Sequence, residues 1–155
     1  PVAEKFVPDQ MKALSDSLAG AKDKFGKGDY AGAMVAAKDI PAKASEVVAA
    51  AKAKKEELSK AWESLSKDVT ASKGAITARF GELAAMKKLP KGMDKAKVDG
   101  AKADFDAANQ AWGQAEDAAK AGNWTEAMHK GGEVKAKHQE IMSTLGMPAE
   151  PAPAK

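Results

Sequence analysis

The two histidines are the side chains of this chain best suited to metal or acid–base chemistry. Glu126 and His129 have the Glu-x-x-His spacing that di-iron proteins use in helical bundles. Those sites need a second Glu-x-x-His pair, but the matching positions in an internal repeat, described below, are Gly32 and Val35, which cannot bind a metal. His138 lies nine residues after His129, about 180° around a helix, so the two cannot share a site. We therefore predict no metal site, and we expect His138 to be packed and hydrogen-bonded on the apolar face of its helix.

No other group of reactive side chains forms a recognisable catalytic set. The 155 residues include no cysteine, which excludes disulfides, zinc–thiolate sites and thiol nucleophiles. Serines are frequent, but neither histidine has a catalytic signature around it, and the acidic residues fall mostly outside the apolar faces. The glycines of residues 25–29 could be mistaken for a phosphate-binding loop, but no strand precedes them. We predict that the protein is not an enzyme and needs no cofactor.

Two stretches of the chain, 94 residues apart, read as copies of one another. Residues 21–34 align without a gap on residues 115–128, and the similarity continues beyond them. The exchanged side chains are mostly similar in size: Tyr30 and Trp124, Ile40 and Val134, Val47 and Ile141. A repeated helix–turn–helix unit indicates the fold class but not the chemistry.

The composition and the spacing of apolar residues indicate helices throughout. Alanine and lysine dominate the sequence, and apolar residues recur every three or four positions rather than every second one. Pro8 is expected in the first turn of a helix, and Asp29 and Asp94 are expected to cap two later helices. Gly146 and Pro148 should end the last helix. The predicted fold is all-α: an antiparallel bundle of four to five helices, built from two related helical hairpins joined by a long helix.

The chain is expected to form a single domain. Its predicted parts are a lead-in (1–7), a helical-bundle domain (8–146) with hairpins at 8–52 and 94–146 and a connecting helix at 56–88, and a flexible Pro/Ala-rich tail (147–155). Pro41 lies inside the pattern of the second helix and should bend it, because proline lacks a backbone donor. Beyond Pro41 the helix either continues to about residue 88 or folds back near residues 51–57. A continuous helix over 42–88 would span roughly 70 Å, and its first half would need a dimer partner or a second hairpin lying across both halves.

Gly131 and Gly132 interrupt the last helix early, at a cost of about 2 kcal/mol relative to two alanines. In the first copy, Pro41 comes shortly after the positions that align with these two glycines. The second helix of each copy therefore contains residues that disfavour a helix. One explanation is close approach of a neighbouring helix at Gly131 and a tolerated kink at Pro41. The alternative is that both helices bend and open a groove, lined by Met34, Ile40, Pro41, Met128, Gly131, Gly132 and Val134.

Methionine and tryptophan recur at core-facing spacings, and we expect both to pack in the core. These residues are Met11, Met34, Met86, Met128 and Met142, with Trp62, Trp112 and Trp124. A tryptophan that was exposed would instead be an anchor for a partner.

These observations favour a non-enzymatic helical-bundle protein that binds or scaffolds an unidentified protein partner or small ligand, with a homodimer as a further possibility. The alternative is a carrier of a small ligand or metal in the bundle interior. The net charge is only +3 and a single arginine is present, so nucleic-acid binding is not expected. No apolar run approaches the roughly 18 residues of a membrane span. The lack of cysteine favours a periplasmic or other extracytoplasmic location, with the cytoplasm as the alternative.

Overall fold

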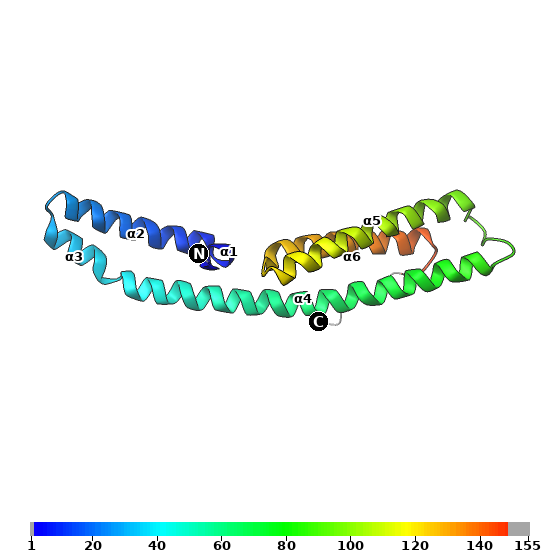
Figure 1. Cartoon of the computed structure of the whole chain (residues 1–155), viewed down its shortest axis with the longest axis horizontal. Coiled ribbons are helices and arrows are strands. Elements are labelled where there is room, and N and C mark those ends of the chain that lie inside the picture. The colour runs from blue at the N-terminus through cyan, green and yellow to red at the C-terminus, as the bar shows by residue number, and fades with distance from the viewer. Residues whose placement is uncertain (1, 149–155) are drawn as a thin grey trace. The chain divides into compact units, whose positions relative to one another are not determined.

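The computed structural model describes residues 2–148 and the side chains of residues 3–148. Every regular element in this part of the chain is an α-helix, which confirms the all-α prediction (Figure 1). The helices are α1 (Val2–Phe6), α2 (Pro8–Gly26), α3 (Tyr30–Lys38), α4 (Ile40–Ala85), α5 (Lys95–Lys120) and α6 (Trp124–Thr144). The short α1 lies within the predicted lead-in, and Pro8 occupies the first turn of α2 as expected.

The turn between α2 and α3 and the turn between α5 and α6 are built in the same way. Gly28 and Gly122 have φ angles of 82° and 73°, a left-handed conformation that suits glycine because it has no Cβ. In each turn the backbone N–H groups bond back to carbonyls of the preceding helix at positions that correspond across the 94-residue offset. The Asp29 and Asp94 carboxylates each accept a backbone N–H three residues on, at 2.9 and 2.8 Å. These two predicted helix caps are therefore confirmed.

Pro41 lies in the first turn of α4 rather than inside a bent helix. Helix α3 ends at Lys38 and α4 begins at Ile40, with Asp39 between them. In a first turn the missing N–H of proline has no helical acceptor to lose, whereas inside a helix it would break a hydrogen bond. The predicted bend is therefore a break between two helices. Beyond it α4 continues without interruption to Ala85, so the continuous-helix alternative is correct and the chain does not fold back.

The contacts between helices divide the chain into two compact units, with the boundary inside α4 between Ser59 and Lys60. The first unit contains α1, α2, α3 and the α4 residues up to Ser59. The second unit contains the α4 residues from Lys60 onward, α5 and α6. The domain limits expected from the sequence stay predictions.

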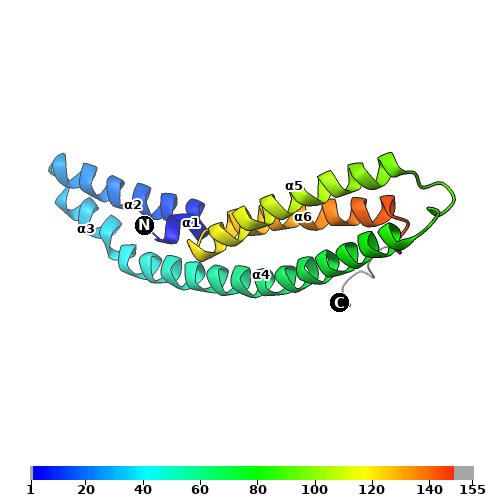
Figure 2. The ribbon, with the colours of Figure 1, turned by 45° about the vertical axis from the view of Figure 1, so that its right-hand side comes forward.

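In the second unit, α5 and α6 lie side by side and both pack on α4 (Figure 2). The buried members of the two main core clusters are Leu65, Val69, Ile76, Leu83, Ala101, Phe105, Ala108, Trp112, Ala115, Val134, Ile141, Met142 and Leu145. The indole rings of Trp62 and Trp112 stack with centroids 5.0 Å apart, and Trp124 packs partly buried against a third cluster. The predicted packing of the three tryptophans is confirmed. Each large apolar side chain that is fully buried contributes roughly 1.5–3 kcal/mol, so this unit has a substantial core of its own.

The first unit has a much smaller core. Among its described residues, the buried apolar side chains are Ala21, Ala33, Val47 and Ala51. Three of these four are alanines, each of which removes only a single methyl group from water. Apolar burial within the unit therefore stabilises its helices only weakly.

Helix α6 ends where the sequence predicts. Gly146 has a φ angle of 66°, and the N–H of Met147 bonds back to the carbonyl of Met142, which is a common glycine-based helix end. Met147, which the predicted tail includes, packs against the core of the second unit. The remainder of that tail from residue 149 lies outside the described residues. Arg79 donates from Nε to the Leu145 carbonyl at 3.2 Å, and so joins α4 to the C-terminal end of α6, where a positive charge is favourable.

Candidate functional site

His138 forms a buried pair with Ser72 in the second unit. The two residues are 1% and 3% exposed, and His138 Nδ1 lies 2.7 Å from Ser72 Oγ. The Ser72 hydroxyl donates its proton to the Val69 carbonyl at 3.0 Å. With the hydroxyl proton on that carbonyl, the serine oxygen accepts from Nδ1–H of His138, the tautomer in which Nε2 carries no proton. The prediction of a packed, hydrogen-bonded His138 is confirmed.

This pair is not an accessible catalytic dyad. Burial lowers the pKa of His138, and the positive charge of Lys73 lowers it further, so the imidazole is kept neutral. The ring of Phe105 lies against it, with centroids 5.5 Å apart. A nucleophile has to reach its substrate, and Ser72 is closed off from solvent. The pair instead links α4 to α6 inside the core.

Glu126 and His129 do not converge on a metal site. The side chain of His129 is 75% exposed, and its Nδ1 lies 3.7 Å from a carboxylate oxygen of Glu133. Glu126 instead lies 3.4 Å from Lys130 Nζ. Within residues 3–148 there is no group of three or more His, Asp or Glu side chains that could hold a metal ion. The Glu-x-x-His spacing therefore belongs to an exposed helix surface.

Three residues of the predicted groove belong to the core of the second unit. Val134 is 1% exposed, and Met128 packs partly buried against the same cluster. Gly131 is buried, and a Cβ added there would lie 2.7 Å from Leu65 Cδ2 and 3.1 Å from Trp62 Cζ3. Atoms in a close-packed core do not tolerate contacts that short. A neighbouring helix therefore does approach closely at Gly131, as the first of the two explanations expects.

The other groove residues lie at the surface or near it. Gly132 is exposed, and a Cβ added there would meet nothing within 4 Å. In the first unit Met34 is 75% exposed, Ile40 is partly buried and Pro41 is exposed. The expectation that Met34 packs in the core is wrong, and Met86 is also 42% exposed. The groove lined by residues of both copies stays a prediction.

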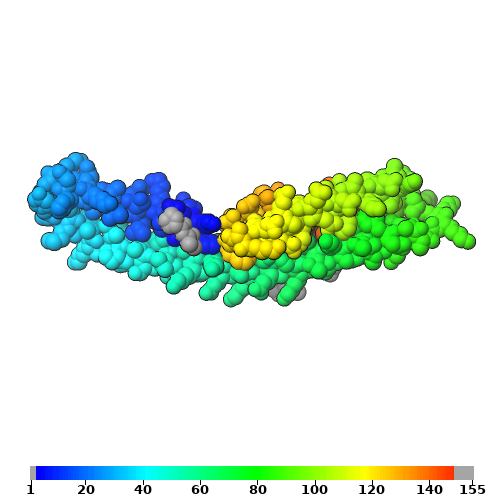
Figure 3. Space-filling view, in the orientation of Figure 1, coloured from blue at the N-terminus to red at the C-terminus, as the bar shows by residue number. Residues whose placement is uncertain are grey.

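An apolar groove lies on the surface of the first unit, between α2 and α3. It encloses about 610 Å³. We call it the first-unit groove; its lining residues are Leu18, Ala21, Lys22, Phe25, Gly26, Tyr30, Ala33, Met34 and Ala37. The rings of Phe25 and Tyr30 meet edge to face beside the turn, with centroids 5.1 Å apart. Four of the lining side chains are 44–75% exposed, on helices whose surface is blue in Figure 3.

These exposed side chains align with residues that are covered in the second unit. Across the 94-residue offset the pairs are Leu18 and Trp112, Phe25 and Ala119, Tyr30 and Trp124, and Met34 and Met128. The second member of every pair is buried or partly buried, and the α4 residues Trp62 and Leu65 pack among them. Val35 is 72% exposed, but it lies outside the groove and aligns with the exposed His129. The first-unit groove is thus the face that α4 covers in the second unit.

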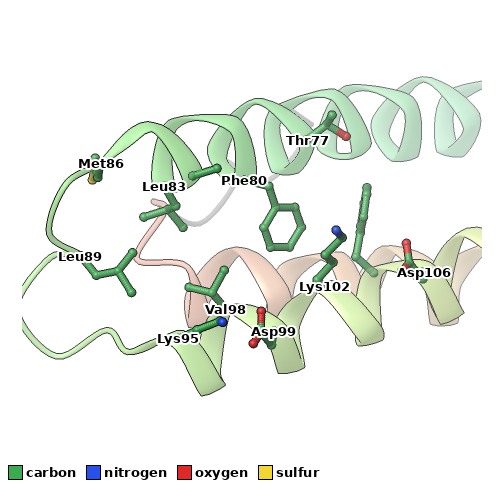
Figure 4. Close-up of a pocket in the computed structure, with 12 residues that line it drawn as sticks. Thr77, Phe80, Leu83, Met86, Leu89, Lys95, Val98, Asp99, Lys102 and Asp106 are labelled. Atoms are coloured by element: carbon green, nitrogen blue, oxygen red, sulfur yellow. The ribbon is translucent and has the colours of Figure 1, made fainter.

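A second cavity opens between the end of α4 and the start of α5, within the second unit (Figure 4). It encloses about 650 Å³, and we call it the second-unit pocket. Phe80 and Leu83 project into it from α4, and Val98 faces them from α5. Two lysines and two aspartates line the α5 side: Lys95, Asp99, Lys102 and Asp106. The pocket therefore combines an apolar wall with charged side chains of both signs, whose formal charges sum to zero.

Sequence reasoning does not identify Ser72 as the partner of His138. Ser72 lies on the apolar stripe of its helix, where a polar residue signals a buried hydrogen bond without naming the partner. The second-unit pocket leaves no signal either, because its apolar residues have the spacing of ordinary core positions. The exposure of the first-unit groove depends on whether another element covers it, and periodicity does not carry that information.

No protein-family model, no curated protein and no solved structure matches this chain. Among the helices of residues 2–148, none combines the length and the apolar character needed to cross a bilayer.

Proposed function

We propose that this protein is a non-enzymatic binding or scaffold protein, and that its first-unit groove takes an amphipathic helix from a protein partner. One observation carries the proposal: apolar side chains are exposed in the first unit at positions whose aligned counterparts are covered in the second. A contiguous apolar surface of this kind on a small protein is typical of an interaction site.

The proposal includes a duplication, in which the α2–α3 and α5–α6 hairpins descend from one helix–turn–helix unit. The ungapped alignment supports it, and so do the corresponding hydrogen bonds of the two turns. In the second unit the hairpin packs on a third helix, the part of α4 from Lys60 onward. The equivalent face of the first unit has the same apolar character without that cover. A helix with an apolar stripe is therefore the partner that the groove fits best.

A synthetic peptide with the sequence of residues 60–85 is a suitable probe, because this segment covers the aligned face in the second unit. The labelled peptide is titrated with full-length protein and followed by fluorescence anisotropy. We expect binding to the wild type, loss of binding with Met34→Lys, and unchanged binding with Val35→Lys. Met34 and Val35 are neighbours with 75% and 72% exposure, but only Met34 lines the groove.

Because both positions are exposed, neither lysine has to be buried in the free protein, and circular dichroism should show equal helix content. Binding that Met34→Lys and Val35→Lys weaken equally would contradict the proposal. So would a wild-type protein that stays monomeric and does not bind the peptide at any concentration.

The second-unit pocket supports a second candidate, the carriage of a small apolar ligand. Its walls include Phe80, Leu83 and Val98, and its volume of about 650 Å³ is in the range of known ligand sites. Native mass spectrometry of protein purified from its source should then detect a bound species. Val98→Trp should displace that species if the pocket holds it. A protein mass equal to that of the bare chain would count against this candidate.

We also propose an extracytoplasmic location, because a chain without cysteine has no thiol that an oxidising compartment could cross-link. Cell fractionation with a marker enzyme for each compartment tests this directly. Recovery of the protein with the cytoplasmic marker would refute it.

A further inference from the structure

We infer that the first-unit groove is covered by the same groove of a second copy of this chain, so that the protein forms a symmetric dimer. The inference rests on the proposed function, because it names the partner of the same surface. Two hairpins that meet through their apolar faces form an arrangement of four helices that encloses a core.

The weak core of the first unit is the first argument for a second copy. Ala21, Ala33, Val47 and Ala51 are the buried apolar residues among those described there, so the unit gains little from its own packing. Larger apolar side chains of the same unit point into the groove instead. A second copy of the chain could cover these side chains. It is present wherever the first copy is, so no other protein has to be available.

The charge of the groove is the second argument. In a symmetric dimer each surface patch meets its own copy, so a patch of one sign would repel itself. Lys22 is the charged residue among the nine that line the groove, and the others are apolar or aromatic apart from one glycine. The groove therefore needs no oppositely charged partner and carries little self-repulsion.

The available area fits a reversible dimer. At 62% and 64% exposure, Phe25 and Tyr30 each offer roughly 100–150 Å² of surface that a partner could cover. With Leu18 and Met34 the apolar area reaches roughly 400 Å² per protomer, and the flanking residues bring a symmetric pair to about 1,000 Å², the lower limit for a specific interface. Interfaces at this low end of the size range are typical of weak or transient association.

Sedimentation velocity of the full-length chain over a wide concentration range tests the inference. We expect the wild type to shift from monomer to dimer as the concentration rises. Met34→Lys places a charge in the interface and should raise the dissociation constant about tenfold or more. Val35→Lys is the matched control and should leave the constant unchanged.

A wild-type chain that is monomeric at all concentrations would overturn the inference. If that monomer still binds the peptide of residues 60–85 in a Met34-dependent way, the proposed function stands and its partner is a different protein. A dimer that Met34→Lys does not weaken would also overturn the inference, because the interface would then lie elsewhere. Co-sedimentation of a monomeric wild type with phospholipid vesicles, lost in Met34→Lys, would assign the groove to a lipid surface instead.

Discussion

Gly131 and Gly132 are neighbours in α6, and we expect the same substitution to alanine to stabilise the protein at Gly132 but not at Gly131. At Gly132 an added Cβ meets no atom within 4 Å. At Gly131 it would lie 2.7 Å from Leu65 Cδ2, 3.1 Å from Trp62 Cζ3 and 3.3 Å from Trp112 Cζ3. Comparing the two substitutions therefore separates two contributions to stability: the helix propensity of alanine and the packing of the second-unit core.

The expected free energies follow from these two effects. Alanine in place of an exposed helical glycine raises the free energy of unfolding by about 1 kcal/mol, so Gly132→Ala should stabilise the protein by that amount. Gly131→Ala gains the same propensity but loses about 1–3 kcal/mol to overpacking, because the added methyl group meets the Leu65 side chain and both indole rings at once. We expect Gly131→Ala to range from neutral to about 2 kcal/mol less stable than the wild type.

Urea unfolding followed by tryptophan fluorescence measures this difference selectively. All three tryptophans, at positions 62, 112 and 124, belong to the second unit, so their emission reports that unit alone. The midpoint should rise for Gly132→Ala and stay equal or fall for Gly131→Ala. Equal stabilisation by both substitutions would show that no close approach exists at Gly131, and the packing of α6 on α4 described above would be wrong.

Two further predictions concern the same core. Burial lowers the pKa of His138, so near pH 6.5 the unfolded chain binds a proton at this residue that the folded chain does not. The free energy of unfolding is therefore highest above that pH and falls as the pH drops below it. Urea midpoints measured between about pH 5.5 and pH 7 should therefore decline toward acid in the wild type and in His129→Gln, but much less in His138→Leu; equal slopes in all three proteins would contradict this. Trp112→Ala removes one ring of the indole stack. In the same assay it should lower the free energy of unfolding of the second unit by about 3–5 kcal/mol. A loss below about 1 kcal/mol would show that the ring is not part of the core.

The helices and most of their ends could be predicted from local signals. Asp29 and Asp94 are good caps wherever they precede an apolar-periodic segment, and Gly28 readily adopts the left-handed conformation that the first turn needs. The local signal at Pro41 is ambiguous, since a proline within a helical pattern is compatible with a bend or with a new first turn. Only the end of α3 at Lys38 decides between them.

The candidate site shows a different limit. The spacing of Met34 correctly marks an apolar face, but a sequence pattern does not reveal whether another helix covers that face. In the second unit α4 covers the aligned residue Met128, and in the first unit the groove stays open. The hydrogen bond between Ser72 and His138 also cannot be predicted from the sequence, because it joins two helices whose relative register is set by packing. Exposure and pairing are tertiary properties, and they decide where this chain can bind.

Hydrogen exchange, measured segment by segment at rising protein concentration, tests the central claim most directly. If the first-unit groove is a surface that a helical partner covers, the amides of α2 and α3 should exchange more slowly as the concentration rises or as the peptide of residues 60–85 is added. The amides of α5 and α6 should not change, because their core is already complete. Exchange in α2 and α3 that is independent of both concentration and peptide would contradict the claim.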